Sequence, residues 1–295
     1  MMGYIGELCI FRYLFVLLSI SSAYCAVTVI PEFGGVLSPN TKSVVLNFGS
    51  SFNPIDPPVD DDTVSAIAFE PLIDVCGKIE RKERLHLVCA AVSDRTGMAV
   101  MHRYNRGGMS SSLREVSFQA HWNNDVSRGD GAKEVVPTLS CTDVLNAIPQ
   151  DITIWYLKTD MQGHDLQSLK SAGEEIRRIH YIKTEVMFKN LKSFEGADND
   201  FCRHWVPYMT YLGYDLIAYI RGGAMVATES NRAGYLDDVC NEDSKHPEGN
   251  WMAEGDAFGV LRGTTLPPPT YVGFEDWPSR DEYFKRSKHS DDYVL

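Results

Sequence analysis

Three residues with useful chemistry each follow a short apolar run that predicts a buried strand. They are Gly49, Glu70 and Asp160. In an open α/β sheet, ligands bind beyond the carboxyl ends of the parallel strands. A glycine there lets the backbone approach a ligand closely because no Cβ intervenes, and a carboxylate accepts hydrogen bonds from hydroxyl groups. The sequence therefore predicts a small-molecule site at one edge of a parallel sheet.

Glu70 is the most informative of these residues. It lies 21 positions after Gly49, close to the roughly 20 residues typical of a nucleotide-binding unit. A carboxylate at this place accepts hydrogen bonds from both hydroxyls of a nucleoside ribose. The structural alternative is a solvated carboxylate that caps the following helix.

The chain around Asp160 offers further polar groups. Asp160 lies beside the mouth of the predicted cleft, or it is a turn residue, since Asp-X-X-Gly is ordinary turn chemistry. We interpret Asp165 as a carboxylate that satisfies free N–H groups at the start of a helix. Glu185 ends the next strand, where it lines the pocket or pairs with a cation.

The elements that must hold these residues alternate between strands and helices. This alternation predicts an α/β fold with a doubly wound, mostly parallel sheet. Ser140 or Thr142 is available as the cap of one helix. The expected strands are 44–48, 66–69, 85–92, 152–157, 181–186, 214–220 and a final antiparallel strand at 256–261, and the expected helices are 72–79, 142–148, 166–179 and 201–212.

Two stretches depart from this alternation. Between residues 97 and 136, alternating segments at Met98–Tyr104 and Val116–Trp122 predict an inserted region of antiparallel hairpins. After Gly49, prolines at positions 54, 57 and 58 oppose a regular helix, and only 16 residues separate Phe48 from Ser65. We therefore expect the first helix to be shortened or absent.

The N-terminus predicts a targeting segment. Arg12 precedes the apolar run Tyr13–Ile20, and small residues follow up to a cleavage site after Cys25. If cleavage fails, Tyr13–Ile30 is nearly long enough for a signal anchor; a buried N-terminal helix is the third alternative. We thus expect a signal peptide or anchor at 1–25, a linker at 26–42, one domain at 43–262 and a tail at 263–295. Such a protein is lumenal or secreted, or membrane-anchored if the signal is retained.

Composition limits the classes of partner. The 295 residues are 44% hydrophobic and 23% charged, enough for one domain with a full core. The formal charge of −12 argues against nucleic acid, because no basic field exists to release counterions. A small molecule or a glycan fits better, and no metal-binding motif occurs.

The cysteines do not form a regular framework. Five of the seven remain if Cys9 and Cys25 leave with the signal, an odd number without regular spacing. Cys76 and Cys89 lie in apolar segments and are expected to pack in the core. Cys202 and Cys240 are able to pair in an oxidising lumen.

Taken in order, several segments resemble the motifs of the FkbM methyltransferases, over about residues 40–220. The most specific are the Phe-Glu-Pro segment that contains Glu70 and the Lys-X-Asp-X-Gln-Gly-X-Asp segment that contains Asp160. The matching segments are Val44–Ser51 (VVLNFGSS), Ala66–Pro71 (AIAFEP), Ala90–Gly97 (AAVSDRTG), Ser110–Leu113 (SSSL), Leu139–Leu145 (LSCTDVL), Leu157–Leu169 (LKTDMQGHDLQSL), Ile182–Val186 (IKTEV) and Leu212–Tyr214 (LGY).

The resemblance implies a class I methyltransferase, Rossmann-like fold with a seven-stranded sheet that binds S-adenosylmethionine. The implied reaction is methyl transfer to an oxygen, typically a hydroxyl on a sugar or small metabolite. The loop after the first strand would pass under the methionine part, and Glu70 would bind the ribose. The cofactor-binding residues implied are Asn47, Gly49, Ser50, Glu70, Asp94 and Asp160.

Methyl transfer from a sulfonium mainly requires alignment of the acceptor and the methyl group. A hydroxyl acceptor also needs a base within hydrogen-bond reach. Asp160 or His164 is the candidate catalytic base, since histidine titrates near neutrality. Alternatively, His164 is a solvent-facing residue in the first turn of a helix.

Two departures from the family pattern support an alternative function. Asn47 stands where the family usually has an acidic residue, and the loop after Gly49 is rich in proline instead of glycine. The alternative is a non-catalytic, methyltransferase-like binding or scaffold protein that has lost cofactor binding. A nicotinamide-dependent oxidoreductase is disfavoured, because G-X-G-X-X-G is absent after the first predicted strand.

Overall fold

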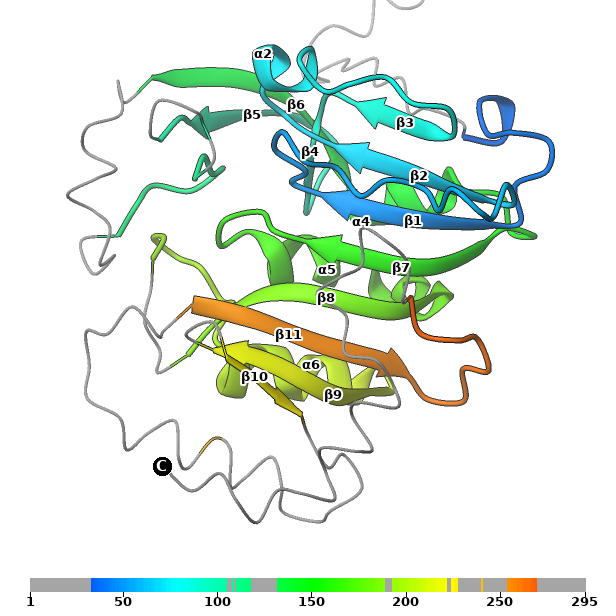
Figure 1. The fold of residues 1–295 in the computed structure, drawn as a ribbon. Helices are drawn as coiled ribbons and strands as arrows, with labels where there is room; N and C mark the ends of the chain where they lie inside the picture. Colours follow the sequence, from blue (N-terminus) through cyan, green and yellow to red (C-terminus); the bar gives the residue numbers. More distant parts are fainter. Residues whose placement is uncertain are drawn as a thin grey trace, which may run out of the picture.

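The computed structural model describes residues 33–104, 108, 110–117, 132–188, 193–221, 224–227, 240 and 254–269. Its centre is an eight-stranded sheet with the order β10-β9-β11-β8-β7-β1-β2-β3 (Figure 1). The strands are β1 (Ser43–Phe48), β2 (Val64–Phe69), β3 (Leu85–Val88), β7 (Thr153–Thr159), β8 (Ile179–Met187), β9 (Tyr214–Arg221), β10 (Ala224–Ala227) and β11 (Glu254–Leu261).

The strand directions confirm the predicted fold class. Strands β3, β2, β1, β7 and β8 run parallel, and β11 lies antiparallel between β8 and β9. The final antiparallel strand expected at 256–261 is therefore present. Beyond the seven expected strands, β10 adds an edge strand that pairs antiparallel with β9.

The inserted region contributes β5 and most of β6 to a second, three-stranded sheet with the order β4-β6-β5, in which β4 pairs parallel with β6. Its strands are β4 (Ala91–Ser93), β5 (Gly97–His102) and β6 (Lys133–Ser140). The expected strand 85–92 is therefore too long, because β3 ends at Val88 and the chain then leaves the main sheet. The expected strand at Met98–Tyr104 is β5, which pairs antiparallel with β6. Of Val116–Trp122, Val116 forms an isolated bridge with Phe194, and residues 118–122 lie outside the described part of the chain.

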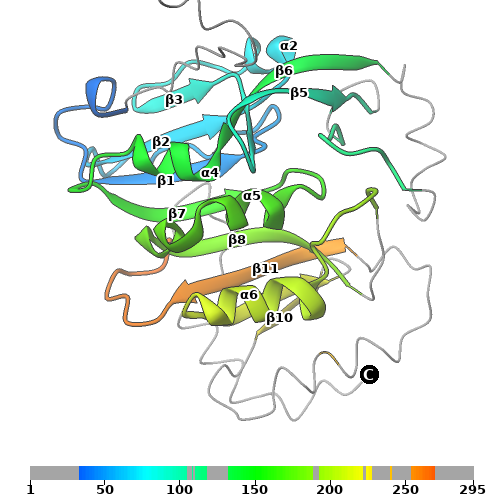
Figure 2. The same cartoon turned by 180° about the vertical axis from the view of Figure 1, so that it is seen from behind.

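Three helices cover one face of the main sheet: α4 (Cys141–Asn146), α5 (Asp165–Ser171) and α6 (Val206–Tyr211) (Figure 2). Ser140 caps α4, where its hydroxyl accepts a hydrogen bond from Asp143 N. A short helix, α2 (Ile73–Cys76), follows β2, and the remaining helical segments are the 3-10 helices η1 (Phe33–Gly35) and η2 (Gly173–Arg178) and the π-helix η3 (Phe201–Trp205).

The core beneath these helices is built from one row of side chains across four parallel strands. Ile67, Leu46, Leu157 and Ile182 stand side by side in the strand register, and each is fully buried. Such unbroken burial is typical of parallel strands covered on both faces.

The crossover from β1 to β2 contains no helix, although the structure describes every residue between them. This confirms the expectation drawn from the three prolines. The loop instead packs on the sheet through Ile55, which clusters with Val45 and Ala68. The side-chain oxygen of Asn47 accepts a hydrogen bond from Ile55 N at 3.1 Å, so Asn47 fixes the loop to β1.

Arg84 holds the far end of the same loop. Its guanidinium donates to the backbone oxygens of Asp61 (2.7 Å), Val64 (2.6 Å) and Pro58 (2.7 Å). One side chain thus satisfies carbonyl groups that a crossover helix would pair internally.

Residues beyond both expected ends of the domain also pack on the sheet. Phe33 and Leu37, placed in the linker, are buried in the main core. In the expected tail, Leu266 packs on the face opposite α4, α5 and α6, where its backbone oxygen accepts from Tyr181 Oη at 2.7 Å. Trp155 Nε1 likewise donates to the backbone oxygen of Pro267 at 2.9 Å.

The cysteines form two disulfides among the described residues. Cys76 pairs with Cys89, so the expectation of simple core packing for this pair is wrong. Cys202 pairs with Cys240, as expected. Cys141 is a free, buried thiol.

In the described part of the chain, no helix is both long and apolar enough to span a membrane. The expected signal peptide or anchor at 1–25 lies outside that part.

Candidate active site

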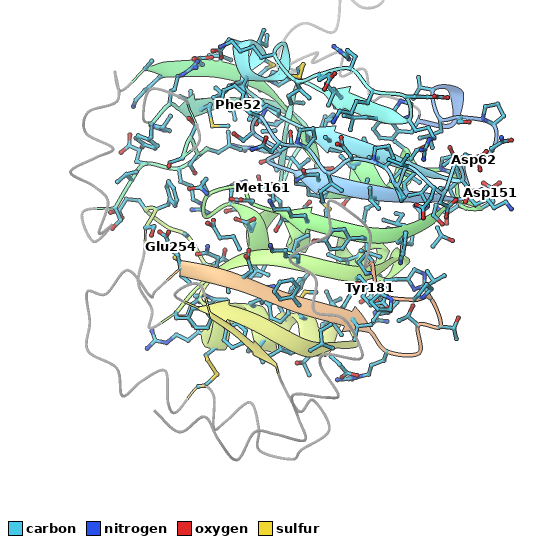
Figure 3. All side chains as sticks on the ribbon, in the orientation of Figure 1. Phe52, Asp62, Asp151, Met161, Tyr181 and Glu254 are labelled. Atoms are coloured by element: carbon cyan, nitrogen blue, oxygen red, sulfur yellow. A yellow bond between two sulfur atoms is a disulfide. The ribbon has the colours of Figure 1, made fainter. Side chains whose placement is uncertain are left out.

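The ends of three parallel strands come together at one edge of the sheet. Phe48 stands opposite Phe69 on one side and Thr159 on the other, so the residues that follow them are neighbours. These are Gly49, Glu70 and Asp160, and all three line a cleft that opens to solvent. Figure 3 shows Met161 at this edge of the sheet, and Asp62 and Asp151 at the opposite edge.

Gly49 is required by a close approach of two backbone segments. Its φ is +74°, and a Cβ here would lie 2.0 Å from the backbone oxygen of Asp160. The 2.0 Å approach excludes a side chain, and the positive φ also favours glycine. The glycine therefore makes room for the neighbouring strand end, in addition to lining the cleft.

Glu70 is a buried carboxylate at the cleft wall. It is 6% exposed, and its oxygens accept hydrogen bonds from Ser51 N and Leu72 N, each at 2.9 Å. Burial raises the pKa of Glu70, although these two N–H groups act in the opposite direction. Because each carboxylate oxygen has two lone pairs, each keeps one for a ligand.

An apolar slot lies beside this carboxylate. Its walls come from the chain after β2, from the three-stranded sheet and from the loop after β7. The inserted region therefore contributes part of the wall. The apolar lining residues are Pro71, Ala91, Val92, Met101, Leu113 and Met161. Sequence reasoning did not single out these side chains, although the resembling segments at 90–97 and 110–113 contain three of them.

Two lining residues hold unusual backbone conformations. Ser51 has a φ of +48° and Gln162 a φ of +53°, which is uncommon outside glycine. Gln162 is fixed because its backbone oxygen accepts from Ser112 Oγ at 2.7 Å. Such strain is typical of functional sites, and sequence analysis did not predict a role for either residue.

Asp160 presents an accessible carboxylate at the cleft. Its side chain is 39% exposed. One oxygen accepts from Gln162 Nε2 at 2.9 Å, and the other lies 3.9 Å from Lys158 Nζ. A ligand in the cleft can therefore reach the carboxylate.

His164 also lines the cleft, but it is buried. It is 6% exposed, so the alternative of a solvent-facing histidine is wrong. Burial, assisted by the charge of Arg114, lowers the pKa of His164 to about 4. The ring is therefore neutral at pH 7 and is a weak proton acceptor.

Three expected cofactor residues are not among the described residues that line the cleft. Asn47 binds the crossover loop, and Ser50 is buried with its N–H donated to Phe69 O at 3.0 Å. Asp94 accepts from Gln167 Nε2 at 2.8 Å and Ser93 Oγ at 3.0 Å. Burial raises the pKa of Asp94, but these hydrogen bonds outweigh it and leave the pKa below its ordinary value.

Two further acids lie behind the cleft. Asp165 Oδ1 accepts from Met161 N at 3.0 Å, in the loop before α5, so this contact fixes that loop and is not the helix-start contact expected of Asp165. Burial and the neighbouring Asp160 raise the pKa of Asp165 to about 7. The same two causes raise the pKa of Glu185, whose Oε1 lies 3.4 Å from Gln162 Nε2.

Residues 44–216 match the family described as Methyltransferase FkbM domain. The chain belongs to this family. The match covers more than half of the 295 residues, from β1 into β9, and includes every strand end that lines the cleft. The mostly parallel sheet of the chain, with β11 antiparallel, agrees with the expected class I methyltransferase fold.

Other comparisons add little to the FkbM assignment. No curated protein matches the chain. A solved structure, a TehB-like SAM-dependent methyltransferase from Corynebacterium glutamicum ATCC 13032 Kitasato, is 8% identical with a TM-score of 0.32. That match covers 87% of this chain and 97% of the other, and it is too distant to support an argument.

Proposed function

We propose that this FkbM-family protein is an S-adenosylmethionine-dependent methyltransferase that acts on a hydroxyl group of a sugar or small metabolite. The observation that carries the proposal is Glu70, a buried carboxylate with a free lone pair on each oxygen, beside an apolar slot. Ribose hydroxyls fit the carboxylate, and a purine base fits the slot.

The residues of the cleft can be assigned to the parts of the cofactor. Glu70 would hold the ribose, and Pro71 and Met161 would contact the base. The chain from Gly49 to Ser51 and the carboxylate of Asp160 would lie along the methionine part. When bound, S-adenosylmethionine supplies a methyl group on a positively charged sulfur.

We assign the proton-accepting role to Asp160. It lines the cleft and its side chain is accessible, so an acceptor hydroxyl can donate to it and lose its proton there. Its neighbour Gln162 orients the carboxylate through the hydrogen bond to Oδ1. His164 is less suited, because it is only 6% exposed and an acceptor hydroxyl reaches it less readily.

The second candidate is a methyltransferase-like scaffold without cofactor. It is favoured by Asn47, which stands where the family usually has an acidic residue. The amide oxygen of Asn47 already accepts a hydrogen bond from Ile55 N. It is disfavoured by the cleft itself, because Glu70 and Asp160 both line it.

Calorimetric titration of the full chain with S-adenosylhomocysteine tests the proposal. We expect binding, and we expect 2′-deoxy and 3′-deoxy forms of the ligand to bind about tenfold more weakly, because each leaves a Glu70 lone pair unused. No binding at high micromolar ligand would support the scaffold.

The acceptor class has its own test. The chain is incubated with cofactor labelled in the methyl group and with glycan or metabolite mixtures. A hydroxyl acceptor yields a methyl ether, which survives mild alkali. Label released as methanol would indicate a carboxyl acceptor and contradict the proposal.

We further propose that the protein works in the secretory pathway, either free in the lumen or outside the cell, or anchored by its N-terminal segment. Support comes from the disulfides Cys76–Cys89 and Cys202–Cys240, because such bonds persist in oxidising compartments. The acidic net charge of −12 favours a small molecule or glycan over nucleic acid as partner.

A further inference from the structure

Resting on the proposed function, we propose that Arg103, directly after β5, is a positioning residue for the ribose of the cofactor. It holds Asp74 in the first turn of α2, the helix that follows Glu70. The inserted region therefore determines how well Glu70 recognises the ribose hydroxyls. Arg103 acts through Glu70, because it is not among the described residues that line the cleft.

The first argument is that α2 cannot fix its own position. It contains four residues, and a single helical turn is unstable without outside contacts. Leu72, its N-cap, donates its N–H to Glu70 Oε1 at 2.9 Å, so any movement of α2 displaces a hydrogen-bond partner of Glu70. The disulfide Cys76–Cys89 fixes the end of α2, and its first turn depends on other contacts.

The second argument is the geometry of the ion pair at that first turn. Arg103 Nη1 and Nη2 donate to Asp74 Oδ1 and Oδ2 at 2.9 Å and 2.8 Å. Two parallel hydrogen bonds fix the orientation of a carboxylate as well as its distance. Nη1 also donates to Glu134 Oε1 in β6 at 2.7 Å, and β6 pairs with β5. The guanidinium thus joins α2 to both of these strands.

The third argument is the apolar packing between the same elements. Leu72 and Val75 form a buried cluster with Met101 and Val136 of the three-stranded sheet. A Cβ at Gly108 would lie 2.7 Å from Leu72 Cδ1, so the chain that follows β5 also lies directly on Leu72. Apolar contacts hold the surfaces together but are not directional. The ion pair is therefore the contact that sets the orientation of α2.

The ribose contact is the part of cofactor binding that depends most on this orientation. Glu70 and Pro71 line the same cleft as Met101, Gly108 and Leu113 of the inserted region. Hydrogen bonds from two hydroxyls to one carboxylate require fixed directions, whereas contacts of the base with an apolar slot tolerate small shifts. Loss of the two-bond contact should therefore weaken recognition of the ribose more than binding of the base.

The test compares S-adenosylhomocysteine with its 2′-deoxy form by calorimetry on the full chain and on Arg103→Lys. Lysine keeps the positive charge but cannot form the two parallel hydrogen bonds. We expect the preference for the intact ligand to fall from about tenfold to about threefold or less. An undiminished preference in Arg103→Lys would overturn the inference and leave the proposed function intact. Failure of the unmodified chain to bind S-adenosylhomocysteine would instead overturn the proposed function, and this inference with it.

A second pair of variants removes the partners of Arg103 one at a time. Asp74→Ala and Glu134→Ala each delete one carboxylate, and these side chains are 46% and 36% exposed, so both variants should fold even if Arg103→Lys does not. Only Asp74 belongs to α2. We expect Asp74→Ala to lose the preference for the intact ligand and Glu134→Ala to keep it. The same preference in both variants would contradict the inference.

Arg178→Lys controls for general loss of stability. The side chains of Arg178 and Arg103 are equally exposed, at 16%. Arg178 donates to the backbone oxygens of Leu145, Ile148 and Pro149, and it precedes β8 at the edge of the sheet opposite the cleft. We expect this variant to unfold at lower urea concentration with an unchanged preference between the two ligands. An equal loss of preference in Arg178→Lys would overturn the positioning role of Arg103.

Discussion

Glu70 combines two tasks in one carboxylate. Its oxygens accept the N–H groups of Ser51 and Leu72, which fixes the chain on both sides of the cleft mouth. The lone pairs that remain are those offered to a ligand. A substitution at this position therefore acts on the shape of the cleft and on its chemistry together.

Two measurements on a Glu70→Gln variant should separate the structural task of Glu70 from its task in ligand binding. The amide brings an N–H donor against one of the two backbone N–H groups, so we expect a loss of about 1–3 kcal/mol in the free energy of unfolding. We also expect weaker binding of S-adenosylhomocysteine. Urea unfolding and calorimetry measure the two effects.

The deoxy forms of the ligand supply the control for Glu70→Gln. If Glu70 binds the ribose, the variant should lose most of the discrimination between the intact and deoxy ligands. A variant that binds weakly but discriminates as well as the unmodified chain would assign Glu70 a structural role alone.

At the residue scale, the sequence predicted the strand-end residues Gly49, Glu70 and Asp160, because an apolar run shows where a parallel strand stops. It did not predict the surroundings of His164. That ring contacts Ser93, and the charge of Arg114 helps to lower its pKa; both residues come from segments distant in sequence. Nor did it predict the left-handed conformation of Gln162, which the contact with Ser112 fixes.

Among the elements, α5 begins with a carboxylate that is costly to ionise. Burial and Asp160 raise the pKa of Asp165 to about 7. The folded chain thus keeps a proton there that the unfolded chain releases above its ordinary pKa of 3.8. The contribution of Asp165 to stability therefore falls as the pH rises from about 4 to about 7.

An Asp165→Asn variant should remove this dependence, since an amide oxygen can still accept from Met161 N. We expect the variant to gain stability relative to the unmodified chain by about 1 kcal/mol or more between pH 5 and pH 8. Urea unfolding at several pH values measures this difference. A constant difference across that range would show that the carboxylate ionises normally.

The disulfide Cys76–Cys89 joins two elements that flank the cleft. Cys76 ends α2, which follows Glu70 and Pro71, and Cys89 precedes Ala91. A double Cys→Ser replacement of this pair should lower the free energy of unfolding by about 2–3 kcal/mol. It should also weaken S-adenosylhomocysteine binding several-fold, because the two walls are no longer tied.

The second disulfide provides a matched control. Cys202 lies in η3, beside α6 and far from α2 in the fold (Figure 1). Replacing Cys202 and Cys240 should destabilise the chain without changing ligand affinity. Equal effects of the two pairs on affinity would contradict a specific role for Cys76–Cys89.

Helices and strands were predicted correctly where the local sequence signal was strong. The prediction failed where a contact with a distant residue determined the structure. The prolines after Gly49 correctly predicted a crossover without a helix. The apolar run 85–92 predicted one strand, yet the chain leaves the main sheet after Val88 and Ala91 joins β6 in the second sheet. The pairing of Cys89 with Cys76, at a separation of 13 residues, was not visible in the apolar pattern.

For the molecule as a whole, the state of the cysteines reports the compartment and the processing of the chain. If the signal is cleaved after Cys25, five of the seven cysteines remain, and two disulfides leave Cys141 free. Thiol titration of the denatured, unreduced protein from a secreting cell should therefore give one thiol per chain. A value near five would contradict the oxidising location, and a value near three would indicate a retained N-terminal segment with Cys9 and Cys25 reduced.

The positions of most strands were predictable because each strand is a separate apolar run, and their parallel arrangement followed from the alternation with helices. The limits of the domain were not. Phe33 and Leu266 lie outside the expected boundaries, yet they pack on opposite faces of the same sheet. Single apolar residues within polar stretches give no periodic signal, so their burial becomes visible only in three dimensions.

Arg84 makes the crossover loop dependent on a residue outside it. A helix carries its own hydrogen bonds and tolerates changes of length turn by turn, whereas this loop relies on a guanidinium that reaches Pro58, Asp61 and Val64 from the start of another strand. Inserting or deleting a residue between positions 50 and 63 would move those carbonyl groups out of its reach. Loop length and position 84 are therefore expected to vary together among related chains, and a relative with a helical crossover has no need of an arginine there.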